Sequence, residues 1–507
     1  MLKKINKKLL FYFTPFLLGV MTSFSLPPYN LFFLNFITFP FLFIFFLNNF
    51  NKNKWKSFTI GWIFGFGYFL SNIYWVTNSL TFEEIFKILI PFALVLIPLF
   101  LGLFYGFATY IFSFINPGKN FSSILIFSLI LSSIEFIRGI ILGGFPWNLI
   151  AFSWTEYTNF LQILAFIGTY SFNLISITLF LVPSVIFFNI NLRLKLILNI
   201  LLIILIGTNF YYGKKVKNNY NNKENITLNT NIKIISPNIE LDRFFQNEDT
   251  SIIINELIEL SKPGKDNEIL IFPEGILANI LLEDLHIYRE KFKNNFSKNH
   301  KILLGINSYE NSKIFNSLVV FENDLSILAK YNKNKLVPFG EFLPFENIFS
   351  KIGLKKITQG YISFSSDSDR NILEINDLKF LPLICYEIIY SGNLNKKNQE
   401  FDFIINISED GWFGESIGPY QHFSHAIFRS IEEGKDIIRS TNGGISAHIN
   451  AKGEILRKIK STDKGVIEVK SYKKNSKTFF SIHGNKIFFY FAFFYIILSF
   501  FLKKKES

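Results

Sequence analysis

Three segments of this chain carry side chains that could act together in covalent catalysis. Glu274 follows the apolar run Ile-Leu-Ile-Phe-Pro, and Cys385, the only cysteine, follows Leu-Pro-Leu-Ile. Two lysines, Lys333 and Lys335, lie in the segment Tyr-Asn-Lys-Asn-Lys-Leu-Val-Pro-Phe-Gly-Glu. Active sites are commonly built on loops at the ends of strands. The three segments are therefore candidates for one site.

Acyl transfer is the chemistry that these side chains fit. A thiol needs a base to become a nucleophilic thiolate, and Glu274 could take its proton. The oxyanion of a tetrahedral intermediate needs positive charge and N–H donors, which a lysine and the backbone N–H of Tyr386 could supply. Taken singly, each residue has a plainer explanation: a solvated carboxylate, a surface lysine or a small buried cysteine. Strand alternation places Lys333 and Lys335 on the same face, so it does not choose between them.

Taken together, the motifs resemble those of the nitrilase superfamily. They are Pro-Glu at 273–274, Tyr-x-Lys-x-x-Leu-x-Pro-x-Gly-Glu at 331–341 and Cys-Tyr-Glu at 385–387. Further motifs are similar to the membrane-bound branch of that superfamily, the apolipoprotein N-acyltransferases. They are Gly-Phe-Pro-Trp at 144–147, Asp-Gly-Trp-Phe-Gly at 410–414, Gly-Pro-x-Gln-His at 418–422 and Arg-Ser-Thr-Asn-Gly-Gly-Ile-Ser at 439–446.

The resemblance implies a role for each matching residue. Glu274 corresponds to the general base and Cys385 to the nucleophile. Lys333 corresponds to the catalytic lysine of the family, because it stands two residues after Tyr331 and three before Leu336. The supporting residues that the resemblance implies are Glu341, Tyr386 and Glu387.

The resemblance also implies the reaction and its partners. A fatty acyl chain moves from a membrane phospholipid, through a cysteine thioester, to the N-terminal amine of a diacylated prolipoprotein. No cofactor is expected. No metal site is expected either, because His422 and His425 lack the further ligands that a metal needs. Two positions depart from the family pattern. Glu409 stands where the family usually has Asn, and Phe245 stands where a Trp is expected.

The composition indicates a membrane protein. Hydrophobic residues make up 49% of the 507 residues, Phe alone occurs 64 times, and charged residues fall to 18%. So many phenylalanines in water would leave large apolar patches. The net charge of +13 could suggest nucleic acid. However, many lysines flank apolar runs and no nucleic-acid-binding motif is present, so no nucleic-acid partner is expected.

Apolar runs approach or reach the length of about 20 residues that a membrane-spanning helix needs. Eight such runs cover residues 9–25, 31–48, 57–77, 87–115, 122–142, 162–188, 193–211 and 484–502. They predict a seven-helix membrane domain over 1–211, a catalytic domain over 212–483, and a last helix with a cytoplasmic tail over 484–507. Residues 214–222 read as a polar linker. Within the fifth run, Glu135 and Arg138 predict an internal ion pair or a polar contact.

Loop charges predict the orientation, because Lys and Arg collect on the cytoplasmic side. Basic residues follow the second, fourth, sixth and eighth runs, which places both termini in the cytoplasm. The large domain then lies on the opposite face of the bacterial inner membrane, in the periplasm.

Strands and helices alternate in the large domain, which predicts an α/β sandwich of the nitrilase-like αββα type. Two apolar stretches, Ile276–Leu282 and Phe345–Ile357, predict a lid that rests on the membrane and guides an acyl chain; the alternative is core helix. Two other functions remain open at this point. One is a membrane-tethered amidohydrolase that acts on small amides. The other is a transporter or binding protein, although the first four runs contain few charges that could mark an ion pathway.

Overall fold

Long helices form where the sequence carries its apolar runs. In the part of the chain that the structure describes, they are α1 (Leu2–Ser23), α2 (Asn35–Asn49), α3 (Lys54–Ile73), α5 (Ile90–Phe112), α6 (Phe121–Arg138), α8 (Leu164–Leu181), α9 (Leu192–Asn221) and α15 (Lys486–Glu506). Six segments, containing α2, α5, α6, α8, α9 and α15, are long and apolar enough to cross a membrane. The apolar part of α1, Lys8–Ser23, is shorter. The expected membrane bundle is confirmed, with about eight as an approximate helix count.

The predicted polar linker after the seventh run is wrong in its conformation. Helix α9 continues without interruption to Asn221, so the stretch that begins at Lys214 is helical. Lysine is a good helix former, and a helix that is already nucleated extends at little cost. Polarity therefore marked where the apolar surface ends, but it did not mark the end of the helix.

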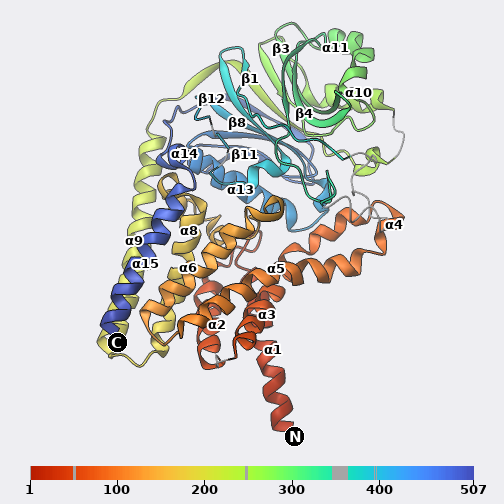
Figure 1. The fold of residues 1–507 in the computed structure, drawn as a ribbon. Helices are drawn as coiled ribbons and strands as arrows, with labels where there is room; N and C mark the ends of the chain where they lie inside the picture. The colour runs from red at the N-terminus through yellow and green to blue at the C-terminus, as the bar shows by residue number, and fades with distance from the viewer. Residues whose placement is uncertain are drawn as a thin grey trace. The chain divides into compact units, whose positions relative to one another are not determined.

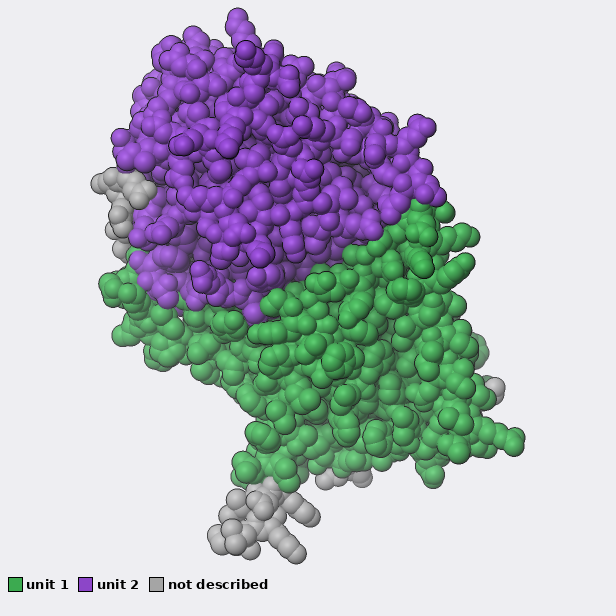
Figure 2. Space-filling model, turned by 180° about the vertical axis from the view of Figure 1, so that it is seen from behind, with its two compact units in different colours: residues 1–77, 83–219, 482–507 green, residues 78–82, 220–481 purple. Residues whose placement is uncertain are grey.

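The chain divides into two compact units, which Figure 2 shows in different colours. The structure is a computed structural model that describes residues 2–49, 53–245, 249–344, 363–392, 394–395 and 397–506. Unit 1 comprises Met1–Thr77, Glu83–Asn219 and Ile482–Ser507. Unit 2 comprises Asn78–Phe82 and Tyr220–Ser481.

Unit 1 holds the helix bundle, with two short helices, α4 (Glu84–Lys87) and α7 (Thr158–Leu161), between the long ones. Glu135 and Arg138 of α6 are both buried, and Arg138 Nη2 lies 3.9 Å from Glu135 Oε1. Glu135 also accepts hydrogen bonds from the Tyr105 hydroxyl at 2.7 Å and from the Asn173 amide at 2.6 Å. The pair is thus part of an internal polar network, which is how charges are tolerated within a membrane bundle.

Two six-stranded sheets form the centre of unit 2 (Figure 1). The first sheet has the order β12 (Gly465–Tyr472), β1 (Ile226–Ser236), β2 (Glu268–Ile271), β3 (His300–Glu310), β4 (Lys313–Phe321) and β5 (Ile327–Asn332). The second has the order β11 (Ile455–Ile459), β10 (Ser446–Ile449), β9 (Asp436–Asn442), β8 (Phe403–Glu409), β7 (Leu378–Ile384) and β6 (Leu373–Ile375). In each sheet the central strands pair in parallel and the outer ones antiparallel.

The core of unit 2 follows the two-residue alternation of its strands. Ile269 and Ile271 of β2 face the second sheet, where they join Phe403 and Ile405 of β8 in one buried cluster. Leu270, between them, faces the opposite way and joins a second cluster. Strands that are buried on both faces read as continuous apolar runs, which explains the run Ile-Leu-Ile that ends β2.

Helices cover the outer faces of the two sheets (Figure 1). Side chains of α10 (Thr250–Ser261) and α11 (Arg289–Asn295) pack in the second cluster on the first sheet. Helix α13 (Gly418–Glu433) packs against β9 and β10 of the other sheet. A short helix, α14 (Phe479–His483), precedes α15. The layers are therefore helix, sheet, sheet and helix, and the predicted αββα sandwich is confirmed.

The predicted lid at Ile276–Leu282 is wrong. Ile276, Leu277, Ile280 and Leu282 are buried in the same cluster as α10 and α11. Their apolar character reflects packing beneath the first sheet, and they are not available to rest on a membrane. The second predicted lid stretch, Phe345–Ile357, lies outside the described residues.

Candidate active site

A buried cluster of charged and amide side chains joins three strands of the first sheet. Lys333 Nζ donates to Glu274 Oε1 at 3.0 Å and to Glu341 Oε1 at 2.9 Å. Asn316 of β4 bridges the same two carboxylates, at 2.6 Å to Glu274 and 2.8 Å to Glu341. All four side chains are buried. Two carboxylates thus lie within hydrogen-bonding distance of one ammonium group, and all of them are shielded from bulk water.

The sheet places these residues close together because they stand at strand ends or within neighbouring strands. Glu274 follows β2, and Lys333 follows β5 directly. Gly305 of β3 lies between them, where a Cβ atom would meet Glu274 Cα at 2.5 Å and the Pro273 carbonyl oxygen at 2.7 Å. Only a residue without a side chain allows the turn at Glu274 to pack this closely. We expect any larger residue at position 305 to displace Glu274.

The structure separates the two lysines that the strand pattern could not distinguish. Lys333 is 1% exposed and lies in the cluster. Lys335 instead places its ammonium group 5.8 Å from the ring centroid of Tyr390. Burial by itself lowers the pKa of Lys333, but the charges of Glu274 and Glu341 outweigh it and raise that pKa well above its ordinary value. Lys333 therefore stays an ammonium and keeps one of its three N–H donors beyond the two bonds to the carboxylates.

Cys385 stands on a strained turn at the end of β7. Its φ angle is +48°, in the left-handed region that non-glycine residues rarely adopt. It is partly exposed and opens the short 3₁₀ helix η10 (Cys385–Ile389). Loss of water around the thiol and the nearby charge of Glu274 raise the pKa of Cys385 well above its ordinary value, although Lys333 acts in the opposite direction. The thiol is therefore protonated at rest and needs a base before it can attack.

Glu387 is a clamp between the Cys385 turn and the Lys333 segment. Its Oε2 accepts the Ile384 N–H at 2.8 Å, just before the cysteine. Its Oε1 accepts from the Tyr331 hydroxyl at 2.6 Å, the Asn334 N–H at 2.9 Å and the Arg370 guanidinium at 2.7 Å. Glu387 is fully buried, so these contacts place it behind the turn as a positioning residue. The Tyr386 ring is also buried and lies 5.5 Å from the ring of Tyr390.

A second buried network supports Glu274 from the other sheet. The backbone N–H of Glu409 donates to Glu274 Oε2 at 2.9 Å. The side chain of Glu409 forms an ion pair with Arg243 and accepts from Asn442 at 3.0 Å and 3.1 Å. Glu409 is one of the two departures from the family pattern, and Arg243 supplies the charge that makes a buried glutamate tolerable there.

Phe245, the other departure, lies two residues after Arg243. Its ring stacks on Phe82 at 5.8 Å and meets Trp412 edge-on at 6.4 Å. The neighbouring Phe244 ring lies 5.2 Å from Trp412 and borders Gly275, the residue after Glu274. An aromatic cluster thus forms beside the carboxylate cluster, with Phe245 taking part in it.

Behind the cysteine, Asp410 connects three buried polar side chains. It accepts from Ser408 at 2.6 Å, His422 at 2.9 Å and Arg439 at 2.7 Å. Burial raises the pKa of Asp410, but Arg439 and His422 outweigh it and lower that pKa below its ordinary range. The His422 ring is also hydrogen-bonded to the backbone of Cys385. His422 therefore links Asp410 to the backbone of the Cys385 turn.

Within the described ranges, no three or more His, Cys, Asp or Glu side chains gather as metal ligands would. Arg429 pairs with Glu432 at 2.7 Å.

Asn316, Arg243 and Asp410 were not predicted as site residues. Asn316 carried a weak signal, because it is a polar residue just before the apolar strand run Ser-Leu-Val-Val-Phe. Arg243 carried none, since its partner lies 166 residues further along the chain.

Two family sequence models match this chain. The apolipoprotein N-acyltransferase N-terminal domain matches residues 18–182, and the carbon-nitrogen hydrolase domain matches residues 256–471. Together with the helix bundle and the two-sheet sandwich, these matches define a membrane protein with a carbon-nitrogen hydrolase domain.

Full-length relatives give the family. The apolipoprotein N-acyltransferase of Rickettsia prowazekii is 30% identical over 479 residues, which cover 92% of this chain and 94% of that relative. The apolipoprotein N-acyltransferase of Rhizobium rhizogenes is 28% identical over 477 residues, 89% of this chain and 88% of that relative. The chain belongs to the apolipoprotein N-acyltransferase family.

Solved structures are more distant. A CN-hydrolase superfamily protein from Xanthomonas campestris is 14% identical, with a TM-score of 0.35, over 48% of this chain and 90% of that chain. An amidase from Nesterenkonia sp. AN1, in which acrylamide has added to the active site cysteine, is 12% identical, with a TM-score of 0.34, over 47% of this chain and 92% of that chain.

Proposed function

We propose that this protein is an N-acyltransferase that moves a fatty acyl chain from a membrane phospholipid to the N-terminal amine of the diacylglyceryl-cysteine of apolipoproteins. The observation that carries the proposal is the buried Glu274–Lys333–Glu341 cluster in the same domain as a strained, protonated Cys385. Family membership supports the substrate class. The phospholipid as acyl donor is part of the proposal.

In the first half-reaction, Glu274 takes the thiol proton of Cys385 and the thiolate attacks the ester carbonyl of the phospholipid. The remaining N–H of the Lys333 ammonium and the backbone N–H of Tyr386 stabilise the oxyanion. As the intermediate collapses, the C–O bond breaks and Glu274 returns the proton to the leaving alkoxide. A lysophospholipid departs and a thioester remains on Cys385.

In the second half-reaction, the α-amine of the lipoprotein attacks the thioester carbonyl. Glu274 takes a proton from the attacking nitrogen, the C–S bond breaks and the proton passes to the departing sulfur. The product is an amide and the thiol is restored. The aromatic cluster around Phe245 and Trp412 offers an apolar surface next to the Glu274 turn for the acyl chain or the peptide.

We propose that the catalytic domain, residues 212–483, faces the periplasm and that both termini lie in the cytoplasm of a bacterium with an inner membrane. Basic residues follow α2, α5 and α8 and occupy the end of α15, and the positive-inside rule places these ends in the cytoplasm. Alkaline phosphatase fused after Gly213 should then be active, and a fusion after Asn53 should be inactive. The reverse pattern would show that the orientation is inverted.

The function is tested by following a labelled acyl chain. Full-length protein in lipid nanodiscs that contain acyl-labelled phospholipid is given a synthetic diacylated lipopeptide with a free N-terminal cysteine amine. We expect the label to move to the lipopeptide as an amide, measured by mass. The same lipopeptide with an acetylated amine is the control and should stay unlabelled, because its nitrogen is no longer nucleophilic.

Other outcomes would point to the other functions. Hydrolysis of small amides without any transfer to the lipopeptide would indicate an amidohydrolase. If the labelled lipid is bound without any bond being broken, the protein is a binding protein or a transporter. Either result would overturn the proposed acyl transfer.

A further inference from the structure

Lysines gather where the chain of unit 2 meets its two membrane helices. Helix α9 leads into unit 2 at Tyr220, and the segment after β12 leads back through α14 to α15. The lysines of this region, here called the stem lysines, are Lys223, Lys435, Lys452, Lys473, Lys474 and Lys477. They come from four separate parts of the sequence, so only the fold brings them together.

The ring of Tyr220 lies among three of these ammonium groups. Lys452, Lys223 and Lys473 lie 5.5, 5.8 and 5.9 Å from its centroid. The Tyr220 ring is buried and its hydroxyl donates to Asp436 at 3.3 Å. A buried aromatic ring thus anchors three cationic side chains where α9 enters unit 2.

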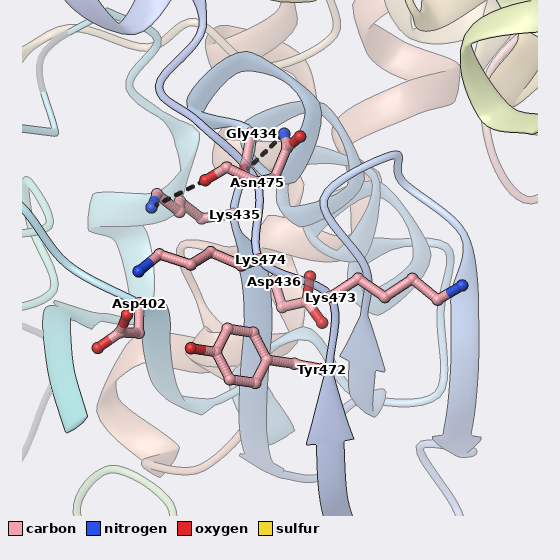
Figure 3. Close-up of a pocket in the computed structure, with 8 residues that line it drawn as sticks. All are labelled: Asp402, Gly434, Lys435, Asp436, Tyr472, Lys473, Lys474 and Asn475. Carbon is pink, nitrogen blue, oxygen red and sulfur yellow. Dashed lines mark hydrogen bonds between the residues drawn. The ribbon is translucent and has the colours of Figure 1, made fainter. Parts of the chain in front are cut away.

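The other stem lysines border a small pocket, which Figure 3 shows. Lys435, Lys473 and Lys474 line it, together with Tyr472 and Asn475. In that view the side chains of Lys435 and Lys474 extend to the same side, and Lys473 extends the other way. Lys435 Nζ reaches the Asn475 carbonyl oxygen at 3.4 Å, and Lys474 is exposed.

Nearby carboxylates also serve other groups. Asp436 accepts from His448 at 2.9 Å, and Asp402 accepts the Lys379 N–H at 3.0 Å. Glu400 pairs with Lys477 at 2.9 Å, and Glu454 accepts from Asn450 at 2.9 Å. The six stem lysines thus outnumber these four carboxylates.

The lysines also disfavour one another's charge. Burial and the repulsion of Lys223 lower the pKa of Lys452 to about 8. Burial lowers the pKa of Lys435, and Lys474 and Lys477 lower it further, against the opposite effect of Glu400 and Asp402. An anion bound among these groups would offset the repulsion and raise both pKa values.

Helix geometry places the stem lysines within reach of lipid headgroups. Tyr211 and Tyr212 are exposed near the end of the apolar part of α9, as tyrosines at a membrane interface are. Tyr220 stands eight residues further along the same helix, about 12 Å at 1.5 Å per residue. The headgroup layer is roughly 5–8 Å deep, and lysine side chains can reach back into it. Exposed Phe479 and Ile482 mark the return to the membrane just after Lys477.

We propose that the stem lysines form a binding site for the phosphate of an anionic phospholipid headgroup in the bilayer that α9 and α15 cross. Phosphate is the anion that lies at this depth, and lysine clusters next to membrane helices attract anionic lipids. The site holds unit 2 to the membrane surface at its stem. The proposal of this lipid site does not depend on the acyl transfer proposed above, because lipid binding alone tests it.

The test compares two triple variants of the full chain in nanodiscs of phosphatidylcholine and phosphatidylglycerol. The site variant is Lys223→Gln, Lys473→Gln and Lys474→Gln. The matched control, Lys265→Gln, Lys298→Gln and Lys313→Gln, removes the same charge at exposed positions outside the stem. The measurement is the ratio of phosphatidylglycerol to phosphatidylcholine that stays bound after extraction, counted by native mass spectrometry.

Wild type and control should be enriched in phosphatidylglycerol, and the site variant should lose the enrichment. A lysine near an anionic surface contributes about fivefold in affinity, so the loss of three lysines should weaken lipid binding roughly a hundredfold. Added salt should lower the phosphatidylglycerol enrichment of wild type toward that of the site variant. If the triple variant unfolds, Lys474→Gln alone should lower the enrichment about fivefold. Acyl transfer in nanodiscs with a neutral acyl donor should be unchanged.

Two results would overturn the proposal. One is equal enrichment in the site variant and the control. The other is displacement of phosphatidylglycerol from wild type by inorganic phosphate at the same concentration, which would identify a site for free phosphate.

Discussion

The Cys385→Ser variant is expected to form no thioester and to show no turnover. Wild-type protein purified from membranes should carry a hydroxylamine-sensitive acyl group before any lipoprotein is added. The thiol of Cys385 already has a raised pKa and needs Glu274 as its base. A serine hydroxyl has a far higher pKa, so the same carboxylate cannot activate it. Loss of a nucleophile of this kind typically costs on the order of a millionfold in rate.

Intact-mass analysis before and after addition of a diacylated lipopeptide is the decisive measurement. Cys385 is the only cysteine, so any thioester reports on this position alone. Glu274→Gln should also fail to load, since no group would take the thiol proton. Because the two substrates react in turn, initial-rate lines should run parallel. Active enzyme with an unmodified Cys385 and intersecting lines would mean direct transfer in a ternary complex, and the thioester mechanism would be wrong.

Lys333→Ala is expected to abolish detectable acyl-enzyme formation, whereas Lys335→Ala should keep most of it. Lys333 donates to both Glu274 and Glu341, and in the proposed mechanism it stabilises the developing oxyanion. Removing one oxyanion donor typically costs about a hundred- to a thousandfold in rate. Lys335 points to Tyr390 and leaves the carboxylate cluster intact. The rate of acyl loading, measured by mass over time, distinguishes the two variants.

Folding must be separated from chemistry in this comparison, because Lys333→Ala leaves two buried carboxylates without their cation. Loading rates should therefore be expressed per folded molecule, with the folded fraction taken from thermal unfolding of each variant. Lys335→Ala is the matched control, since it removes the same charge two residues away. Equal losses in both variants would show that the wrong lysine, or the wrong role, has been assigned.

Local sequence patterns predicted most of the fold. The apolar runs predicted the long helices, because a helix that crosses a bilayer needs about 20 consecutive apolar residues. The strands β2 and β7 were predicted from short apolar runs, and the alternation of strands with helices predicted the sandwich. The linker after Tyr212 and the lid at Ile276–Leu282 were wrong for a common reason. Polarity and apolarity describe a surface, and they do not say whether that surface faces lipid, water or a neighbouring sheet.

The sequence by itself determined the candidate nucleophile and base, since Cys385 and Glu274 stand at the ends of their own strands and need only local context. The choice of Lys333 came from motif spacing, and the tertiary structure then placed it between Glu274 and Glu341. Only the tertiary structure revealed Asn316 as the bridge between the two acids.

Only the tertiary structure, likewise, explained the two departures from the family pattern. Arg243 pairs with Glu409 across 166 residues, and Phe245 meets Trp412 from the same turn. Periodicity and motifs arise from neighbours in the chain, so one sequence displays them. The packing of two sheets brings a buried charge next to a partner that is distant in the sequence. Local sequence patterns therefore do not predict which residue that partner is.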